Sequence, residues 1–158
     1  SPEPVPIAEL AQDTVMQYTP QAEGAGVELS LDLPEERARV EADIGLIERA
    51  LSNLIDNAIQ YTPEGGTVQV RVRAVTDGVC VAVEDTGPGI PEDDLPHIFE
   101  RFYRVDKSRD RERGGAGLGL AIAHKILELH DGSLAVDSEV GAGTTFRFVL
   151  PVPSAEPA

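Results

Sequence analysis

The chain has 158 residues, 41% of them hydrophobic and 26% charged, so it is long enough to fold as one globular domain with a substantial core. Its 13 basic and 28 acidic residues give a net charge of −15, which argues against nucleic-acid binding and against docking on an anionic membrane. Cys80 is the single cysteine, so an internal disulfide and a cysteine-rich zinc site are excluded.

Proline is concentrated at both ends of the chain. Six of the twelve prolines lie in the first six and last eight residues. We therefore expect a linker over residues 1–6, a folded domain over residues 7–151 and a flexible tail over residues 152–158. The start at Ser1 without a methionine suggests a segment of a longer protein.

Helical periodicity dominates the first third of the domain. Apolar residues recur at helical spacing over residues 7–23 and predict a helix, and Met16 is expected in or near the core. Alternation predicts a strand over residues 27–31, and a short strand is expected at residues 39–41. Asp43 can cap a second helix, whose apolar stripe consists of Ile44, Ile47, Leu51, Leu54, Ile55 and Ala58.

The middle of the chain predicts a hairpin followed by a long loop. Alternating valines over residues 67–74, a turn at Asp77 and Gly78, and an apolar run over residues 79–84 indicate two antiparallel strands, the second of them central. The following stretch is rich in glycine, proline and charge and is too long for a plain connection. We expect a functional lid over about residues 91–115.

The end of the chain predicts one more helix and two more strands. The helix is expected over residues 117–131, and the strands over residues 134–138 and 145–150. The predicted fold is therefore α+β, a two-layer sandwich with about three helices on one face of a mixed, mostly antiparallel sheet.

Six of the fifteen glycines fall in two clusters, Asp85-Thr-Gly-Pro-Gly-Ile90 and Gly114-Gly-Ala-Gly-Leu-Gly-Leu120. The second cluster opens a helix, where free N–H groups and the helix dipole favour phosphate. Its spacing matches neither the P-loop nor the dinucleotide fingerprint. The clusters indicate a different nucleotide site, and a flexible linker is the alternative.

Basic residues gather next to the second glycine cluster. Residues 101–113 hold six of the 13 basic residues and three acids, so the rest of the chain sums to −18. ATP would be repelled by such a chain unless cations were concentrated at its site. A solvated basic loop is the alternative interpretation.

Polar residues on the second helix fit a metal site. Asn53, Asn57 and Tyr61 lie four residues apart on one helical stripe, and amide oxygens can bind Mg²⁺ together with substrate phosphates. Asp85 ends an apolar strand and is positioned to accept a hydrogen bond from an exocyclic amine. The alternatives are exposed asparagines without a ligand and an Asp85 that only caps its turn.

Together these motifs resemble the ATP-binding catalytic domain of sensor histidine kinases, in the GHKL superfamily of gyrase, Hsp90, MutL and anti-sigma-factor kinases. Asn53-Leu-Ile-Asp-Asn57-Ala-Ile-Gln-Tyr61-Thr-Pro resembles the N box, and Asp85-Thr-Gly-Pro-Gly-Ile90 the first glycine box. The F box, the second glycine box and the closing box are matched by Ile98-Phe-Glu-Arg-Phe-Tyr-Arg104, Gly115-Ala-Gly-Leu-Gly-Leu-Ala121 and Gly141-Ala-Gly-Thr-Thr-Phe146.

The resemblance implies ATP and Mg²⁺ as cofactors and gives each matched residue a role. Asp85 is expected to bind the adenine amine, Asn57 and Asn53 to hold Mg²⁺, and Tyr61 to lie against the nucleotide. The lid is expected to be anchored by Phe99 and Phe102, and to face the phosphates with Arg101 and Arg104. The asparagines and these two arginines are the expected catalytic residues. The remaining residues expected at the nucleotide are Gly87, Gly89, Ile90, Gly115, Gly117, Leu118, Gly119 and Thr145.

Two departures from related patterns matter. The family usually has Lys or Arg where this chain has Gln60, so that phosphate contact is in doubt, and Lys107 is a candidate replacement. Gyrase, Hsp90 and the anti-sigma kinases have a glutamate base where this chain has Asn53. A histidine acceptor needs no such base once its imidazole is unprotonated, which favours the histidine kinase interpretation.

The resemblance also implies partners that this chain does not contain. The acceptor histidine is expected on a separate dimerisation hairpin of the same parent protein, with onward transfer to a response regulator receiver domain. His97, His124 and His130 are interpreted as structural. The fragment is expected to be monomeric and cytoplasmic, without nucleic-acid or direct membrane contact, and its parent to be a homodimer anchored in the bacterial inner membrane.

Other functions fit fewer of the residues. Asp85-Thr-Gly matches the aspartic-protease triplet, but that chemistry needs two such carboxylates and the sequence has one copy. An ATPase or anti-sigma serine kinase would lack its glutamate base. A pseudokinase that binds nucleotide as a regulatory switch is supported by Gln60.

Overall fold

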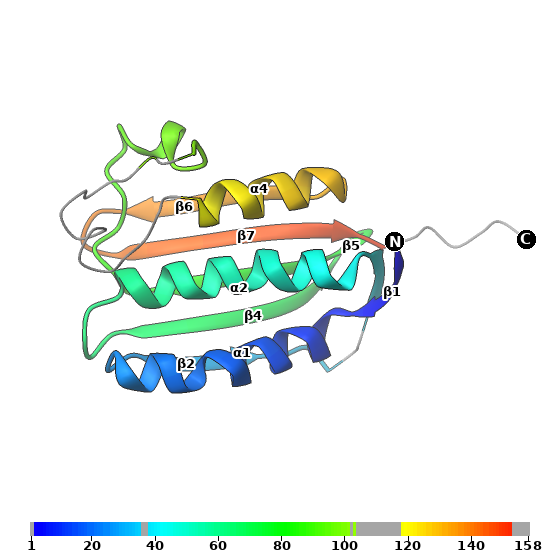
Figure 1. Cartoon of the computed structure of the whole chain (residues 1–158), viewed down its shortest axis with the longest axis horizontal. Coiled ribbons are helices and arrows are strands. Elements are labelled where there is room, and N and C mark those ends of the chain that lie inside the picture. Colours follow the sequence, from blue (N-terminus) through cyan, green and yellow to red (C-terminus); the bar gives the residue numbers. More distant parts are fainter. Residues whose placement is uncertain (1, 36–37, 102, 104–117, 153–158) are drawn as a thin grey trace, which may run out of the picture.

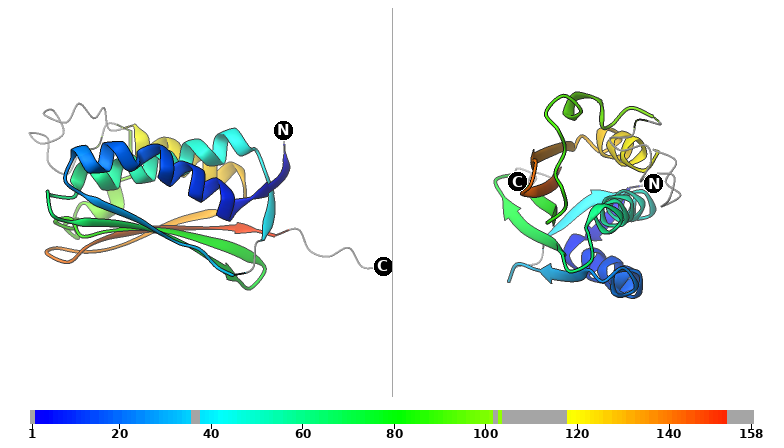
Figure 2. Two further views of the ribbon diagram at one scale, coloured as in Figure 1. Left: turned by 90° about the horizontal axis from the view of Figure 1, so that it is seen from below. Right: turned by 90° about the vertical axis from the view of Figure 1, so that its left-hand side faces the viewer.

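A computed structural model of the chain describes residues 2–35, 38–101, 103 and 118–152. Within these residues the chain forms two layers, with three α-helices on one face of a five-stranded sheet (Figures 1 and 2). The helices are α1 (Ile7–Gly24), α2 (Ile44–Tyr61) and α4 (Gly119–Leu129), with a 3₁₀ helix, η1 (Leu95–His97). The strands are β1 (Glu3–Pro6), β2 (Glu28–Asp32), β3 (Arg39–Ala42), β4 (Thr67–Val75), β5 (Gly78–Asp85), β6 (Ser133–Glu139) and β7 (Gly143–Pro151). The predicted α+β sandwich is confirmed.

The main sheet has the order β2-β4-β5-β7-β6, so β5 is its central strand. β2 pairs with β4 in parallel, and the other pairs are antiparallel. Alternate residues of β4, β5 and β7 point to the helices and are almost fully buried, as period-2 patterning requires. They include Val68, Val70, Val72, Val81, Val83, Phe146 and Phe148.

The second helix forms as its sequence predicts. The carboxylate of Asp43 accepts a hydrogen bond from the N–H of Leu46 (3.1 Å) and caps the helix. The apolar stripe packs into the core, except for Ile44 in the first turn, which is 40% exposed. On α1 the expectation for Met16 is wrong, because Met16 lies one residue beyond buried Val15, off the core-facing stripe, and is 67% exposed.

The first residues of the chain do not form a linker outside the core. Glu3–Pro6 is strand β1, which pairs antiparallel with β3 in a separate two-stranded sheet, and Val5 is fully buried. Prolines are tolerated because no other described strand pairs with the free edge of β1 and only alternate residues of a strand donate to a partner. At the other end Val152 donates its N–H to the carbonyl of Asp77 (3.0 Å) and packs on the core. Residues 153–158 lie outside the described residues.

Truncation of Val5 tests whether β1 belongs to the folded unit. Val5→Ala should lower the free energy of unfolding by about 1.5–3 kcal/mol, because it removes fully buried methyl groups. Val75→Ala is the matched control, because Val75 is 43% exposed and its loss should change stability by less than about 0.5 kcal/mol. Urea unfolding followed by circular dichroism measures both, and equal effects would place residues 1–6 outside the core.

Candidate functional site

Asp85 occupies the end of the central strand and is 6% exposed. Its Oδ1 atom accepts two backbone hydrogen bonds, from Gly87 N (2.9 Å) and Thr144 N (3.3 Å). Burial raises the pKa of Asp85 above its ordinary value, although these two N–H groups oppose the rise. Among the described residues none donates to Oδ2, so that oxygen is available to accept a hydrogen bond from a ligand.

Close backbone contacts hold the turn after Asp85 in place. A Cβ atom on Gly87 would lie 2.8 Å from the carbonyl oxygen of Tyr61, at the end of α2. A Cβ atom on Gly143 would lie 2.1 Å from the carbonyl oxygen of Asp85, and Gly143 has a φ of 112°. Gly89 packs in the same way against the carbonyl of Glu139. These glycines therefore let α2, the turn and the β6–β7 connection meet at Asp85.

The polar stripe of α2 runs from this turn to the start of α4. Tyr61 touches the turn at Gly87, and one of the other stripe residues, Asn53, donates from Nδ2 to the carbonyl of Gly119 (3.2 Å). Asn57 is half-buried and lies one helical turn from each. The amide oxygen of Asn53 has no hydrogen-bond donor among the described residues, so both asparagines retain oxygen atoms for a hard cation.

The start of α4 contributes the positive end of a helix to the same region. Leu118 is the residue before α4, and its carbonyl accepts from the N–H of Ile122 (2.9 Å). Gly119 is exposed and begins the helix beside Asn53. The first N–H groups of α4 are therefore near the asparagines, where the helix dipole favours an anion.

The segment after the first glycine box is attached through Ile98 and Phe99. Ile98 is 4% exposed. The ring of Phe99 stacks on His124 of α4, with centroids 4.8 Å apart, and meets Phe146 of β7 edge-on at 6.2 Å. These contacts attach Phe99 to α4 and β7, and its role as an anchor of the lid stays a prediction. Arg101 is exposed and forms no ion pair with another described residue.

Several expected site residues lie outside the described residues. They are Phe102, Arg104, Lys107, Gly115 and Gly117.

The three histidines have structural contacts. His130 Nε2 accepts from the N–H of Asp43 (3.1 Å), and His130 Nδ1 contacts the carbonyl of Ile126 (2.8 Å). His124 stacks on Phe99, and His97 pairs with Glu100. This agrees with the structural roles predicted for them.

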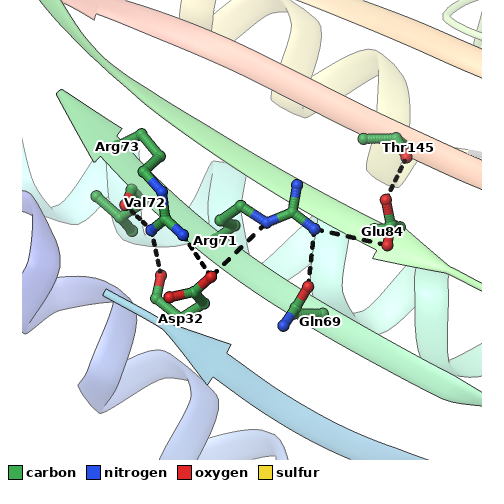
Figure 3. Close-up of polar contacts among 7 residues, drawn as sticks. All are labelled: Asp32, Gln69, Arg71, Val72, Arg73, Glu84 and Thr145. Carbon is green, nitrogen blue, oxygen red and sulfur yellow. Dashed lines mark hydrogen bonds and ion pairs between the residues drawn. The ribbon is translucent and has the colours of Figure 1, made fainter. Parts of the chain in front are cut away.

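Thr145 lies on the opposite face of the sheet from Asp85, although both residues line one cavity at this end of the sheet. Asp85 pairs with Thr144 across β5 and β7, whereas Thr145 pairs with Glu84. Figure 3 shows Thr145 and Glu84 directed toward each other on the face of the sheet that also holds Arg71 (Oγ1 to Oε2, 3.5 Å). Thr145 therefore lies on the opposite face of the sheet, and Thr144, which is 6% exposed, takes its place beside Asp85.

Sequence reasoning also missed Ser138. Its Oγ atom accepts from the N–H of Ile90 (2.7 Å) and lies 2.8 Å from Oγ1 of Thr144. The signal was present in the period-2 pattern, because Ser138 and Thr144 occupy paired positions on the Asp85 face of β6 and β7.

Gln60 is engaged on the helix surface. Its Nε2 donates to Oδ2 of Asp56 (2.8 Å), and Oδ1 of Asp56 accepts from Nε2 of Gln21 on α1 (2.7 Å). Asp56 thus joins α2 to α1 and also holds the amide of Gln60.

A cavity of about 380 Å³ lies at the Asp85 end of the sheet. Its lining comes from β5, β6 and β7 and includes Asp85, Ser138, Thr144 and the carboxylates of Glu84, Asp137 and Glu139. Among the described residues no cluster of three His, Cys, Asp or Glu side chains could hold a metal ion. None of the described helices is long and apolar enough to cross a membrane.

Comparison with known proteins places this geometry in a family. The family model for histidine kinase-, DNA gyrase B- and HSP90-like ATPases matches residues 42–154. The chain is 42% identical to the sensor histidine kinase RppB of Synechocystis over 91% of its length, and 45% identical to the sensor histidine kinase WalK of Bacillus subtilis over 79%. It spans 32% of RppB and 21% of WalK, so it corresponds to a part of these proteins.

Solved structures give the same result. A mycobacterial sensor histidine kinase, MprB, superposes with a TM-score of 0.82 at 31% identity, covering 96% of this chain and 97% of that one. Full-length ShkA in complex with AMPPNP gives 0.85 at 33% identity, with coverage of 98% and 32%. The histidine kinase ThkA in complex with the response regulator TrrA gives 0.79 at 28% identity, with coverage of 95% and 41%.

Alanine substitutions at two glycines of one turn distinguish the stability cost of backbone strain from the cost of a close contact. Gly141 and Gly143 both have positive φ angles, but only Gly143 lacks space for a Cβ atom. Gly141→Ala should cost about 1–2 kcal/mol of stability from the left-handed conformation. Gly143→Ala should cost clearly more, because the backbones of residue 143 and Asp85 must move apart to make room for the new methyl group. Urea unfolding of both variants measures this, and equal costs would mean that the contact at Asp85 is not constrained.

Proposed function

The chain belongs to the family of histidine kinase-, DNA gyrase B- and HSP90-like ATPases and has the fold of a sensor histidine kinase catalytic domain, and on this basis we propose how it works. It binds ATP with Mg²⁺ at the Asp85 end of the sheet. It then donates the γ-phosphoryl group to a histidine on a dimerisation hairpin of its parent protein. Support comes from the orientation of Asp85 and from the similarity to ShkA, which was solved with AMPPNP.

The carboxylate of Asp85 recognises the adenine amine. Oδ1 is held by two backbone N–H groups, so Oδ2 has a fixed direction and accepts from an exocyclic N–H₂ group. A hydrogen bond to a charged acceptor in a buried site is stronger than a neutral one. Thr144, Ile90 and Tyr61 border the same position from β7, the turn and α2.

The phosphates lie toward the asparagines and the start of α4. Asn57 and Asn53 provide amide oxygens of the type that Mg²⁺ accepts beside phosphate oxygens, and the donor set therefore fits the ion. Bound Mg²⁺ would neutralise phosphate charge on a chain of net charge −15. The N–H groups at the start of α4 and the exposed Arg101 add positive potential.

The transfer step needs positioning rather than a base from this domain. An unprotonated imidazole nitrogen of the acceptor attacks the γ-phosphorus, the bond to the β,γ-bridging oxygen breaks, and ADP leaves with the electron pair. The imidazole loses its ring proton to solvent. Asn53 stands where related ATPases have a glutamate base, which suits this acceptor and disfavours water as the nucleophile.

The partners of the parent protein follow from its relatives. RppB and WalK are sensor histidine kinases of which this chain matches a part, and ThkA was solved with a response regulator. We infer that the parent carries the histidine hairpin, is a homodimer anchored in the inner membrane, and passes the phosphoryl group to a receiver-domain aspartate.

One observation favours a second function. Gln60 carries no charge and is bound to Asp56, so the chain lacks one phosphate contact of its family. A pseudokinase that binds nucleotide as a regulatory switch would fit this feature, and an absence of phosphoryl transfer would identify it.

The direction of Asp85 Oδ2 can be tested with an isosteric change. Asp85→Asn keeps an oxygen for Gly87 and Thr144 but places an amide donor against the adenine amine. ATP affinity should fall by about 1.5–3 kcal/mol, or roughly ten- to a hundredfold, in calorimetric titration. Glu41→Gln is the control, because Glu41 is an exposed carboxylate on β3, in the separate two-stranded sheet and outside the cavity, and it should leave affinity unchanged.

The loss of ATP affinity expected for Asp85→Asn should not come from unfolding of the variant. Because burial raises the pKa of Asp85, ionised Asp85 destabilises the ligand-free fold at neutral pH. The Asn variant should therefore be at least as stable at pH 7, and its advantage should vanish as the pH falls below about 4, the ordinary range of a carboxyl group. Unchanged ATP affinity in a folded Asp85→Asn variant would exclude Asp85 from adenine recognition.

Asn57 is tested through metal dependence. Asn57→Ala should weaken ATP mainly when Mg²⁺ is present, because it removes a metal ligand, and should have little effect in EDTA. Gln60→Ala serves as a control amide on the same helix and should show no such dependence on Mg²⁺. Titration of both variants under both conditions decides the matter, since an equal loss of affinity with and without Mg²⁺ contradicts a ligand role for Asn57.

A further inference from the structure

Besides Asp85 itself, Ser138 is a side chain of the described residues that connects the turn after Asp85 with the β7 side of the site. It is half-buried in β6 and lies on the Asp85 face, opposite Thr144. Its Oγ atom is within hydrogen-bond distance of Ile90 N (2.7 Å), Thr144 Oγ1 (2.8 Å) and Gly143 O (3.2 Å). Three segments therefore meet at one hydroxyl.

Each of the two hydroxyl groups, on Ser138 and Thr144, has a single proton, and this limits which hydrogen bonds can form at the same time. Ser138 has one proton and two lone pairs, and Ile90 N–H occupies one lone pair. When Ser138 donates to Gly143 O, Thr144 donates to Ser138 and keeps only lone pairs for a ligand. When Ser138 donates to Thr144, the proton of Thr144 becomes available to a ligand. Ser138 thus fixes the position of the Thr144 hydroxyl while letting it act as acceptor or donor.

Ser138 also influences the orientation of the Asp85 carboxylate. Thr144 donates its N–H to Asp85 Oδ1 (3.3 Å), so any shift of Thr144 changes one of the two bonds that orient the carboxylate. On the other side, the Ile90 N–H would lose its only side-chain acceptor among the described residues without Ser138. A second bond, from Gly141 N to Pro88 O (2.9 Å), joins the same turn to the β6–β7 connection.

The geometry points to Ser138 as a positioning residue of the nucleotide site. By holding Thr144 and Ile90 in place beside Asp85, Ser138 favours binding of the adenine base over other bases. This inference rests on the proposed function. It assigns Ser138 no contact with the reacting phosphate, and it predicts an effect on base selectivity rather than on metal dependence.

The first arm of the test needs no nucleotide. Ser138→Ala should speed amide hydrogen exchange at Ile90 in the ligand-free domain, because that N–H loses its acceptor. Ser133→Ala is the matched control, an exposed serine at the start of the same strand, and should leave Ile90 unchanged. Unchanged exchange in Ser138→Ala would overturn the role of this hydrogen bond.

The second arm compares ATP with inosine triphosphate, in which a carbonyl oxygen replaces the amine. Ser138→Ala should weaken ATP about tenfold, as expected for the loss of one or two hydrogen bonds, and should reduce the preference for ATP over inosine triphosphate. Ser138→Thr keeps the hydroxyl and should restore both, which keeps the test decisive where the alanine variant folds poorly.

The outcomes separate this inference from the function on which it rests. Equal losses for both nucleotides, or no loss, would overturn the selective role of Ser138 while leaving ATP binding intact. A wild-type domain that binds neither nucleotide would overturn the proposed function and, with it, the selective role of Ser138.

Discussion

A buried carboxylate at the end of the central strand sets the requirements for the rest of the site. Removing Asp85 from water is unfavourable, and the fold offsets this with two N–H groups on a single oxygen. Those donors come close enough only because Gly87 packs on the end of α2 and Gly143 packs on the backbone of Asp85 itself. The result is one free oxygen with a fixed direction, which suits recognition of an amine.

The other polar groups gather at the same end of the sheet because three elements end or begin there. The stripe on α2 runs from Tyr61 at the Asp85 turn to Asn53 at the start of α4. This arrangement provides oxygens for a cation and N–H groups for an anion along one line. On a chain of net charge −15, such a site must concentrate positive charge locally before a triphosphate can bind.

Periodicity and capping were sufficient to predict most elements, as α2 shows: Asp43 caps it and its apolar stripe is buried, apart from Ile44. The β1 strand was missed because its prolines resemble a linker, while the burial of Val5 depends on pairing with β3, which local sequence does not specify. The motif pointed to Thr145 and not to Thr144, which pairs with Asp85 on the same face, because a motif gives spacing without strand register and a one-residue shift reverses the face. The period-2 pattern placed Ser138 on one face of its strand, but its contacts with Ile90, Gly143 and Thr144 depend on three segments meeting and are visible only in the tertiary structure.

The most direct test of the account is transfer of labelled γ-phosphoryl from ATP to the separately prepared histidine hairpin of the parent protein, with Mg²⁺ present. The account predicts label on the hairpin histidine only when this domain is added, and roughly five- to fiftyfold less label when Asp85 is replaced by Asn at nucleotide concentrations near the wild-type Kd. Tight nucleotide binding without any label on the hairpin would contradict it and would identify the domain as a nucleotide-binding switch.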